Sequence, residues 1–359
     1  MERSGTCAMP LSRDAVTAGH RAVSVPYQAL LTGLVLTLVT RRGEDVAAEF
    51  VFRLFRRQHL EKFRPGLAKL GLDGLPHAVA CAQYHYLSNQ LGGVKTEYAR
   101  ESDRKAWVRY PPPRWIWYGA AICGIPSRVN AAMLHGWHGH NGVTLGNPRL
   151  GFVCTGQTVD GDPGLEGYYL EHDRDLAPVD RVRFARGERM PAFDPARAPR
   201  LDPGVWPPER LDTVVARYAM EYVRTALPVV LELLGPADTR TLLGHAARLI
   251  GMQYHDQTVA LLGTEGTGPG PFAGYLAALA RAQGEEVAIE AGPDGASVRL
   301  HGWRLARGLD PLDPAAFEAW CELWHGALAA HDRRFRLEVI REPGGDVLFR
   351  VAGLAVMQP

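Results

Sequence analysis

Gln83-Tyr84-His85 returns as Gln253-Tyr254-His255, 170 positions further along the chain. Two dipeptides return in the same order at a distance of 190 positions: Val108-Arg109 as Val298-Arg299, and His135-Gly136 as His325-Gly326. Each match is short, but the constant order and near-constant spacing indicate an internal repeat. The change of 20 positions falls where the second half holds an additional Gly- and Pro-rich stretch, 264–283.

The apolar pattern outside these matches gives both halves the same order of elements. Helices are predicted by the apolar period of 3.6 and by capping residues, and strands and hairpins by alternation and turn residues. The expected helices are 45–63, one around each Gln-Tyr-His segment, 126–138, 211–227 and 314–330, and the expected strands are 94–98, 106–110, 150–155, 165–170, 286–290, 297–300, 335–340 and 347–351. We therefore expect an α+β fold of two related units that arose by internal duplication, each with helices followed by a small antiparallel sheet.

A proline-rich segment separates the two halves. Residues 177–209 hold seven prolines, which exclude a regular helix and favour an extended connector. The expected organisation is a first α+β unit at 1–176, the connector at 177–209 and a second α+β unit at 210–359, with the active site in the first unit.

Composition narrows the class of protein. The chain has 359 residues, 46% of them hydrophobic and 22% charged, with a net charge of +1, which is typical of a soluble globular protein and favours neither nucleic acid nor a membrane as partner. Five widely spaced cysteines without a C-x-x-C motif argue against disulfides and structural zinc and favour the cytoplasm. We interpret the uncharged stretch 22–40 as a buried helix that starts near Pro26 and ends near Gly43, and not as a membrane span. A homodimer remains open as an assembly.

Comparison of the halves separates scaffold from candidate chemistry. The first half reads His-Gly-Trp-His-Gly-His-Asn-Gly at 135–142, where the second half reads His-Gly-Ala-Leu-Ala-Ala-His at 325–331. A helix and a glycine-terminated turn could gather His135, His138 and His140 around Zn²⁺ or Fe²⁺, or let His135 move protons. The alternative is structural or substrate-contacting histidines, with Trp137 stacking on a ligand and Asn141 contacting it.

The strands around this segment supply further candidates. Arg149 could clamp a substrate carboxylate, and Cys154 could be a nucleophile, although a small buried apolar residue is the alternative. Glu166 and Glu171 could act as general acid or base, or belong to a solvated sheet face. Two further residues are expected to contact substrate, Tyr168 from the same strand as the glutamates and Lys95 from the open face of the sheet.

Known phosphate-binding and dinucleotide-binding motifs are missing from the sequence. The Gly-rich stretch 263–270 lacks the lysine of a phosphate-binding loop, so we expect no nucleotide cofactor.

The order of helices followed by a hairpin with a cysteine in its first strand resembles the L-2-amino-thiazoline-4-carboxylic acid hydrolase-like family. The resemblance rests on the helical stretch 45–85, the helix near His135 and the hairpin with Cys154 and Glu171. It implies a small-molecule hydrolase that opens a ring by cleaving C–N or C–S bonds. The doubling, the proline-rich connector and the segment 135–142 depart from the family pattern.

These observations together favour a hydrolase or lyase that acts on a small polar or anionic molecule, with a metal supplied through the histidines. One alternative is a mononuclear non-haem iron oxygenase. Another is a sensor that binds a small molecule or haem, in which the histidines of the two Gln-Tyr-His segments gain importance.

Overall fold

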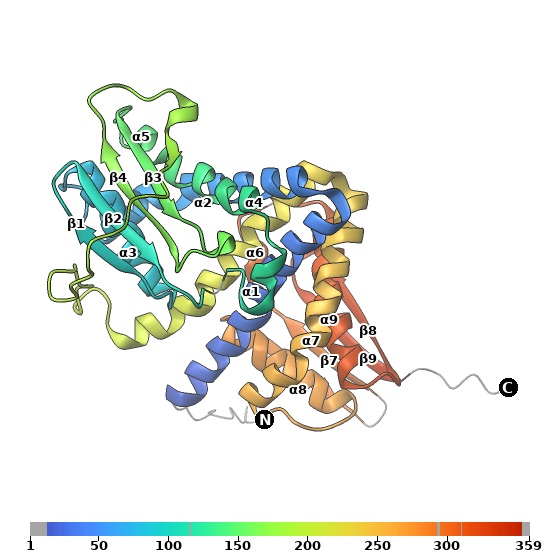
Figure 1. Ribbon diagram of the computed structural model, residues 1–359. Coiled ribbons are helices and arrows are strands. Elements are labelled where there is room, and N and C mark those ends of the chain that lie inside the picture. Colours follow the sequence, from blue (N-terminus) through green and yellow to red (C-terminus); the bar gives the residue numbers. More distant parts are fainter. Residues whose placement is uncertain (1–12, 115, 293–294, 310, 354–359) are drawn as a thin grey trace.

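The computed structural model describes residues 13–353 except 115, 293–294 and 310, and it has an α+β architecture (Figure 1). The elements of the first part are α1 (Arg13–Arg42), α2 (Glu44–Lys69), α3 (His77–Leu91), β1 (Glu97–Arg100), β2 (Lys105–Tyr110), α4 (Ser127–Gly136), α5 (Asn141–Thr144), β3 (Leu150–Gly156), β4 (Leu165–Glu171) and β5 (Val182–Phe184). Those of the second part are α6 (Pro208–Asp238), α7 (Gly244–Leu262), α8 (Pro269–Ala282), β6 (Val287–Ala291), β7 (Gly295–Leu300), α9 (Pro314–His331), β8 (Phe335–Arg341) and β9 (Val347–Gly353).

Two small, separate sheets confirm the expected fold class. The strand order is β1-β2-β4-β3-β5 in the first sheet and β6-β7-β9-β8 in the second, so the first four strands of each follow the same order. All these strands pair antiparallel except β5, which the connector adds in parallel to β3. The predicted hairpins β3–β4 and β8–β9 are both present, and Asp313 caps α9 by accepting a hydrogen bond from the Ala315 amide.

The first helix is longer than the sequence analysis predicted. It already runs at Arg13 and contains Pro26, so the expected start near Pro26 was wrong. Its apolar residues, including Leu30, Leu34 and Leu38, are buried, and α1 packs on α6 and α7. Helix α1 is long and apolar enough to cross a bilayer, and 61% of its apolar window is buried in the protein, as in a core helix.

A glycine interrupts the helical path at the same stage in each half. Gly43 (φ 88°, ψ 171°) separates α1 from α2, and Gly235 (φ 77°, ψ 172°) breaks α6 before α7. Both combinations lie in a region that is open to glycine alone. The glycine therefore precedes α2, and Asp45, where the helix was expected to begin, lies in its first turn.

The repeated His-Gly dipeptide marks a helix crossing in each half. A Cβ at Gly136 of α4 would collide with the Phe52 carbonyl oxygen of α2, and a Cβ at Gly326 of α9 would collide with the Arg248 carbonyl oxygen of α7. Only glycine allows this close approach. The second Gln-Tyr-His segment lies in α7, which makes the corresponding glycine contact in its half, whereas the first lies in α3 and not in α2.

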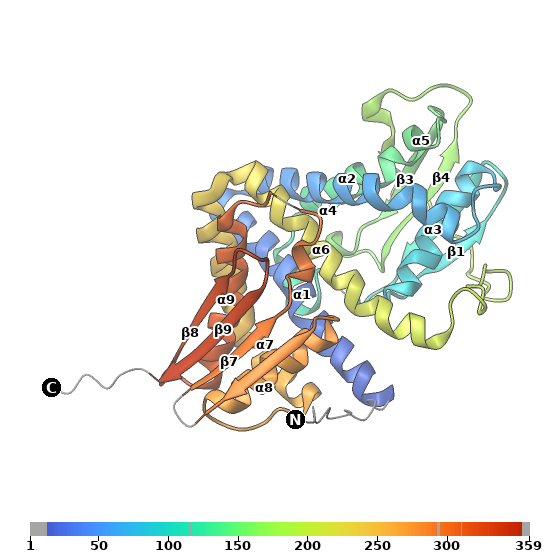
Figure 2. The same cartoon turned by 180° about the vertical axis from the view of Figure 1, so that it is seen from behind.

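The long first helix of each half packs against helices of the other half. Helix α1 contacts α6, α7 and α8, whereas α6 contacts α2 and α3. Figure 2 shows α6 beginning beside the first sheet and ending among the helices of the second half. The connector brings Trp206 to the start of α6, where this residue is buried. A surface of the first half is therefore completed by residues that lie more than a hundred positions later in the chain.

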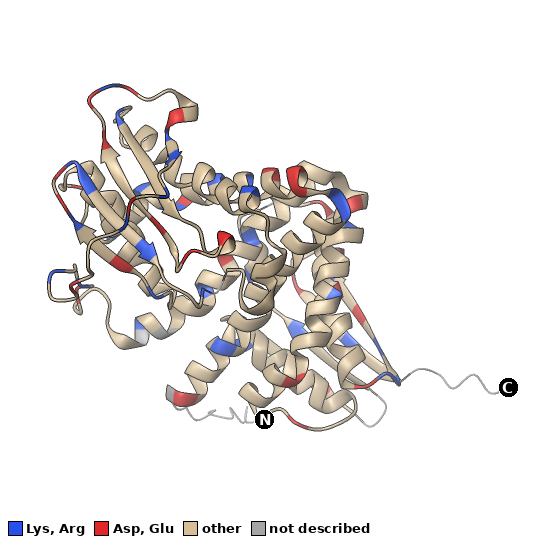
Figure 3. Cartoon of the chain, in the orientation of Figure 1, with Lys and Arg blue, Asp and Glu red and all other residues tan. Residues whose placement is uncertain are grey.

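Basic and acidic residues are interspersed over both halves (Figure 3). This distribution matches the formal net charge of +1.

Candidate functional site

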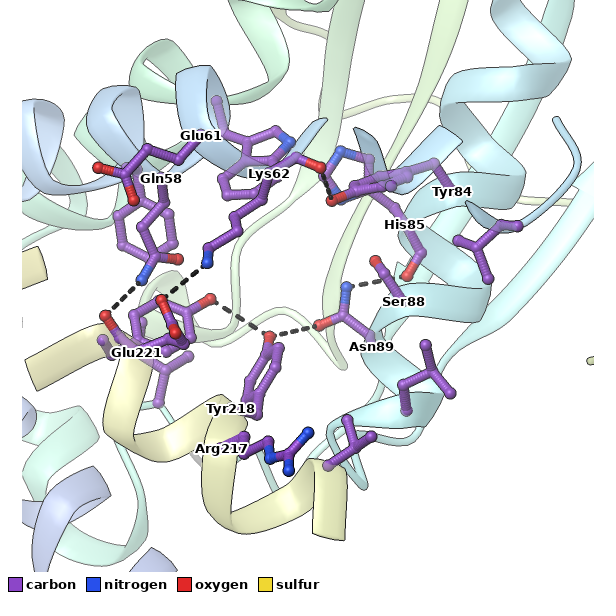
Figure 4. Close-up of a pocket in the computed structure, with 18 of the residues that line it drawn as sticks. Gln58, Glu61, Lys62, Tyr84, His85, Ser88, Asn89, Arg217, Tyr218 and Glu221 are labelled. Atoms are coloured by element: carbon purple, nitrogen blue, oxygen red, sulfur yellow. Dashed lines mark hydrogen bonds and ion pairs between the residues drawn. The ribbon is translucent and has the colours of Figure 1, made fainter. Parts of the chain in front are cut away.

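A cavity of about 430 Å³ lies between α2 and α3 on one side and the start of α6 on the other (Figure 4). Its volume is within the range of small-molecule sites. The lining is largely aromatic, with a set of basic residues among the rings. The lining includes Gln58, Lys62, Lys69, Tyr84, His85, Ser88, Tyr110, Arg114, Met133, Trp137, His138, Trp206, Arg210, Arg217, Tyr218, Glu221 and Tyr222.

Two stacked histidines form part of the cavity wall. The rings of His85 (α3) and His138 are nearly parallel, with centroids 4.1 Å apart. Burial lowers the pKa of His85 to about 3 and that of His138 well below its ordinary value, and the nearby His59 lowers both pKa values further. Both imidazoles are therefore neutral at pH 7, which removes the repulsion that two stacked cations would suffer.

A hydrogen-bonded pair behind the cavity determines which nitrogen of His138 carries the proton. Asn141 Nδ2 donates to the Tyr169 hydroxyl oxygen at 2.9 Å, and this hydroxyl lies 2.6 Å from His138 Nδ1. Tyr169 is fully buried, so its proton needs an acceptor, and among the described residues His138 Nδ1 is the one within reach. Tyr169 therefore donates to Nδ1, which leaves the proton of neutral His138 on Nε2.

His59 of α2 is a further neutral histidine beside this hydrogen-bonded pair. Arg56 Nη1 donates to His59 Nδ1 at 2.8 Å, so the proton of His59 is on Nε2. Burial lowers the pKa of His59 to about 3, and the nearby Asn141 side chain opposes this change. His59 Nε2 and Asn141 Oδ1 are both buried without a hydrogen-bond partner among the described residues, so the chain of donors runs from Asn141 through Tyr169 to His138.

Trp137 adds a second donor to this wall. Its ring packs edge-on against His59 and His85 and lies parallel to Tyr84. Its Nε1 is buried and has no hydrogen-bond partner among the described residues. A buried indole N–H usually finds a partner, so this atom is an unsatisfied donor in the wall of the cavity.

Arg114 is the basic residue deepest in the cavity wall. Its guanidinium carbon lies 5.3 Å from the centroid of the Tyr110 ring. Burial lowers the pKa of Arg114, although the phenols of Tyr110, Tyr218 and Tyr222 oppose this change. The side chain is half-buried, and it lines the cavity.

The mouth of the cavity carries further basic residues. Lys62 Nζ forms an ion pair with Glu221 at 2.8 Å, which Figure 4 shows across the gap between α2 and α6. Lys69 Nζ and the Arg210 guanidinium lie 5.0 and 4.2 Å from the centroid of the Trp206 ring. Burial lowers the pKa of Lys69, and repulsion from Arg210 and other nearby basic residues lowers it further.

From the sequence, Trp137 and Asn141 are expected in the site as substrate contacts and His138 as a metal ligand. Trp137 and His138 line the cavity, and Asn141 lies behind it in contact with Tyr169. The three grouped histidines do not share a centre, since His138 Nδ1 contacts Tyr169 and His140 Nδ1 donates to the His135 carbonyl oxygen. Among the described residues no group of three His, Cys, Asp or Glu could hold a metal ion, so the structure does not assemble His135, His138 and His140 as a ligand set.

The expected catalytic residues of the hairpin lie outside the cavity. The Cys154 thiol is buried and donates to the Gly156 carbonyl oxygen, and burial raises its pKa to about 12, which disfavours a thiolate at neutral pH. Glu166 is buried and accepts a hydrogen bond from Thr155 at 2.8 Å. These contacts are structural, so we do not carry Cys154 or Glu166 forward as catalytic groups.

The remaining candidates are dispersed over the first sheet. Arg149 and Glu171 pair with each other at 2.7 Å beside a second, more open hollow of about 580 Å³. Tyr168 lies on the face opposite to Tyr169, as alternation predicts, and donates to Glu188 at 2.8 Å. Lys95 is exposed before β1.

The residues that the sequence analysis missed come mostly from α2 and α6. Gln58 and His59 belong to a helix interpreted as scaffold, and Tyr218 and Tyr222 were assigned to the apolar face of a helix in the other unit. Arg114 follows three prolines in a stretch that was not interpreted. A tyrosine pair at i and i+4 and a lone arginine among aromatic residues were the available signals, and neither is specific.

No protein-family model, no curated protein and no solved structure matches this chain.

Proposed function

We propose that this protein binds a small, largely apolar molecule in the cavity between α2, α3 and α6. The observation that supports this most directly is the aromatic and apolar lining, into which a few polar groups converge. Trp137 Nε1 lacks a partner, and His138 has its proton on the nitrogen that Tyr169 does not use. Unsatisfied donors in an aromatic cavity are costly unless a ligand or water completes them.

We further propose that the two units arose by duplication and that the second has become a structural partner. Support comes from the shared strand order, the breaks at Gly43 and Gly235 and the two glycine crossings. A reciprocal contact adds to it: Tyr218 of α6 donates to Asn89 at 3.4 Å, and Tyr27 of α1 donates to Gln283 at 3.3 Å. Each long helix thus reaches the third helix of the other unit through a tyrosine.

A neutral fluorescent dye, N-phenyl-1-naphthylamine, tests the proposed binding site. Ser88 lines the cavity and is half-buried, and a Ser88→Trp variant fills the space without removing a described hydrogen bond. Gln90→Trp places the same ring on the exposed side of α3 as a matched control. We expect one saturable dye site in the native protein and in Gln90→Trp, and its loss in Ser88→Trp. Equal dye binding by all three proteins would show that the cavity is not the site.

Enzymatic turnover is the second candidate function, supported by the directional hydrogen bonds that end at His138. An N–H fixed in direction by Tyr169 and Asn141 can donate to an oxygen or leaving group of a bound molecule. This arrangement suits hydrolysis or lysis of a C–N or C–S bond, with His138 in place of Cys154. A His138→Gln variant that binds the dye but no longer turns over a substrate of the wild type would support catalysis, and unchanged turnover would exclude His138.

A further inference from the structure

The charge of Arg114 has no counter-charge in the part of the chain that the structure describes. No carboxylate forms an ion pair with it there, and the groups that oppose the lowering of its pKa are the phenols of Tyr110, Tyr218 and Tyr222. By contrast, Lys62 at the mouth is paired with Glu221. A guanidinium in a low-dielectric environment is costly without a counter-ion. The aromatic ring of Tyr110 compensates part of this cost, since a cation over a ring face is attracted to it.

The donors near Arg114 carry no additional charge. The charge of Arg114 contributes to the lowering of the His138 pKa, so the two side chains interact electrostatically within one site. His138 is neutral and bears its proton on Nε2, and Trp137 offers a neutral indole N–H. The deep part of the cavity therefore combines one fixed positive charge with neutral donors.

This combination selects the charge of the ligand. One guanidinium matches one negative charge, and its planar fork matches the two oxygens of a carboxylate. A phosphate dianion would need a second deep cation, and Lys62 is already neutralised by Glu221. The surrounding rings of Tyr84, Tyr110 and Trp137 favour a planar apolar body attached to the acid group.

We propose that the ligand is a planar, mostly apolar monocarboxylate, whose carboxylate is held by the Arg114 guanidinium and the His138 Nε2–H. This inference rests on the proposed function of the cavity and names the ligand class. Lys69, Arg210 and Arg217 at the mouth attract the anion before it enters, so the rate of association falls as the salt concentration rises.

Displacement of N-phenyl-1-naphthylamine by matched acids and amides tests the proposal. The acids are benzoate, 2-naphthoate and indole-3-acetate, and each amide has the same ring system without the charge. We expect the best acid to displace the dye at a concentration about tenfold or more below that of its amide, because charge-assisted hydrogen bonds are the stronger ones. Thermal shifts with the same compounds provide a reading that does not depend on the dye.

Three variants assign the effect to Arg114. Arg114→Gln should remove the preference for acids while dye binding persists, which shows that the variant is folded. Arg114→Lys keeps the charge without the planar fork and should retain part of the preference. Arg64→Gln removes an exposed charge of α2 outside the cavity lining and should leave the preference unchanged at 0.15 M salt, where surface charges are screened.

The possible outcomes separate this inference from the proposed function. If the dye binds but acids and amides displace it equally, or if Arg114→Gln keeps the preference for acids, the assignment of a carboxylate to Arg114 is overturned and the cavity remains a ligand site. If neither the dye nor any of the acids binds, both proposals fail.

Discussion

Each unit packs against a long helix of the other unit, α6 on the first unit and α1 on the second. The two units differ in how they fill the space beneath this helix. In the second unit Tyr27 of α1 meets Trp320 of α9, which donates to the Tyr27 hydroxyl at 3.3 Å, and both residues are almost completely buried. In the first unit α6 spans a cavity, and the position that corresponds to Trp320 in the proposed duplication is Asn130. The long helix of the other unit thus lies on a packed aromatic core in the second unit and on a cavity in the first.

The difference extends to the polar residues. The first unit holds neutral histidines and the chain of hydrogen bonds that ends at His138. In the second unit, His255 packs against the rings of Tyr275 and His331, and the proposed duplication aligns it with His59. Polar residues in a core lower stability unless they are satisfied, and they are retained where they have a function. The first unit is therefore the one in which function is expected, at a cost in stability.

Replacement of a buried tryptophan by alanine, Trp320 in the second unit or Trp137 in the first, gives the largest expected effect on stability. Trp320→Ala should lower the free energy of unfolding by about 3–5 kcal/mol, because it removes a fully buried ring and leaves a void. Trp137→Ala should cost less, since part of the Trp137 surface already faces the cavity. Denaturant unfolding of both variants measures the difference, and a larger loss for Trp137→Ala would contradict the contrast between packed and open units.

The buried histidines predict a loss of stability in acid that originates in the first unit. The pKa of His85 is lowered from 6.5 to about 3 in the folded state, so between these values the unfolded chain binds a proton that the folded chain does not. Stability should therefore fall as the pH falls from about 6.5 towards 3. At pH 5 His85 alone should cost about 2 kcal/mol.

Unfolding of a His85→Gln variant between pH 7 and pH 4.5 tests this acid sensitivity. The variant should lose stability less steeply than wild type, by about 1.4 kcal/mol per pH unit below pH 6. The exposed His245 lies on α7, and a His245→Gln variant serves as the control, with the slope of wild type. A His85→Gln slope equal to that of wild type would mean that His85 is protonated in the folded protein.

Removal of one hydroxyl behind the cavity should have a smaller effect. Tyr169→Phe leaves His138 Nδ1 and one donor of Asn141 unsatisfied, and should cost about 1–2 kcal/mol. Tyr168→Phe removes a hydroxyl from the opposite face of β4, where its partner Glu188 is exposed, and should cost less than about 1 kcal/mol. A reversed order of the two variants in denaturant unfolding would show that the Tyr169 hydrogen bonds do not stabilise the first unit.

Thiol reactivity gives the smallest expected effect and asks whether the units differ at their cysteines. Burial raises the pKa of Cys154 in the first unit and of Cys321 in the second, so neither thiol should react with a disulfide reagent at pH 8 before unfolding. Cys123 is exposed and should react at once. A Cys7→Ser background removes the cysteine outside the described residues. A fast second thiol that disappears in Cys154→Ala would restore Cys154 as a candidate nucleophile.

The local pattern of the chain was sufficient for the class of fold. The hairpins, the helix cap at Asp313 and the proline-rich connector are short-range features, since turn chemistry and alternation act over a few residues. The repeated His-Gly dipeptide coincides with two close helix contacts, because the packing of two helices at Gly136 and at Gly326 requires glycine. The two Gln-Tyr-His segments lie in helices of different order in their halves, α3 and α7, because a match of three residues does not indicate which helix a segment packs against.

The site was decided by tertiary structure. From the sequence, Trp137, His138 and Asn141 could be selected because the other half lacks them, but a metal centre was a reasonable reading of three nearby histidines. The fold instead directs His138 to Tyr169 and His85, both distant in sequence. Tyr218 joins Arg114 of the first unit in the site because α6 crosses to that unit, and such long-range packing leaves no periodic signal in the residues that it brings together.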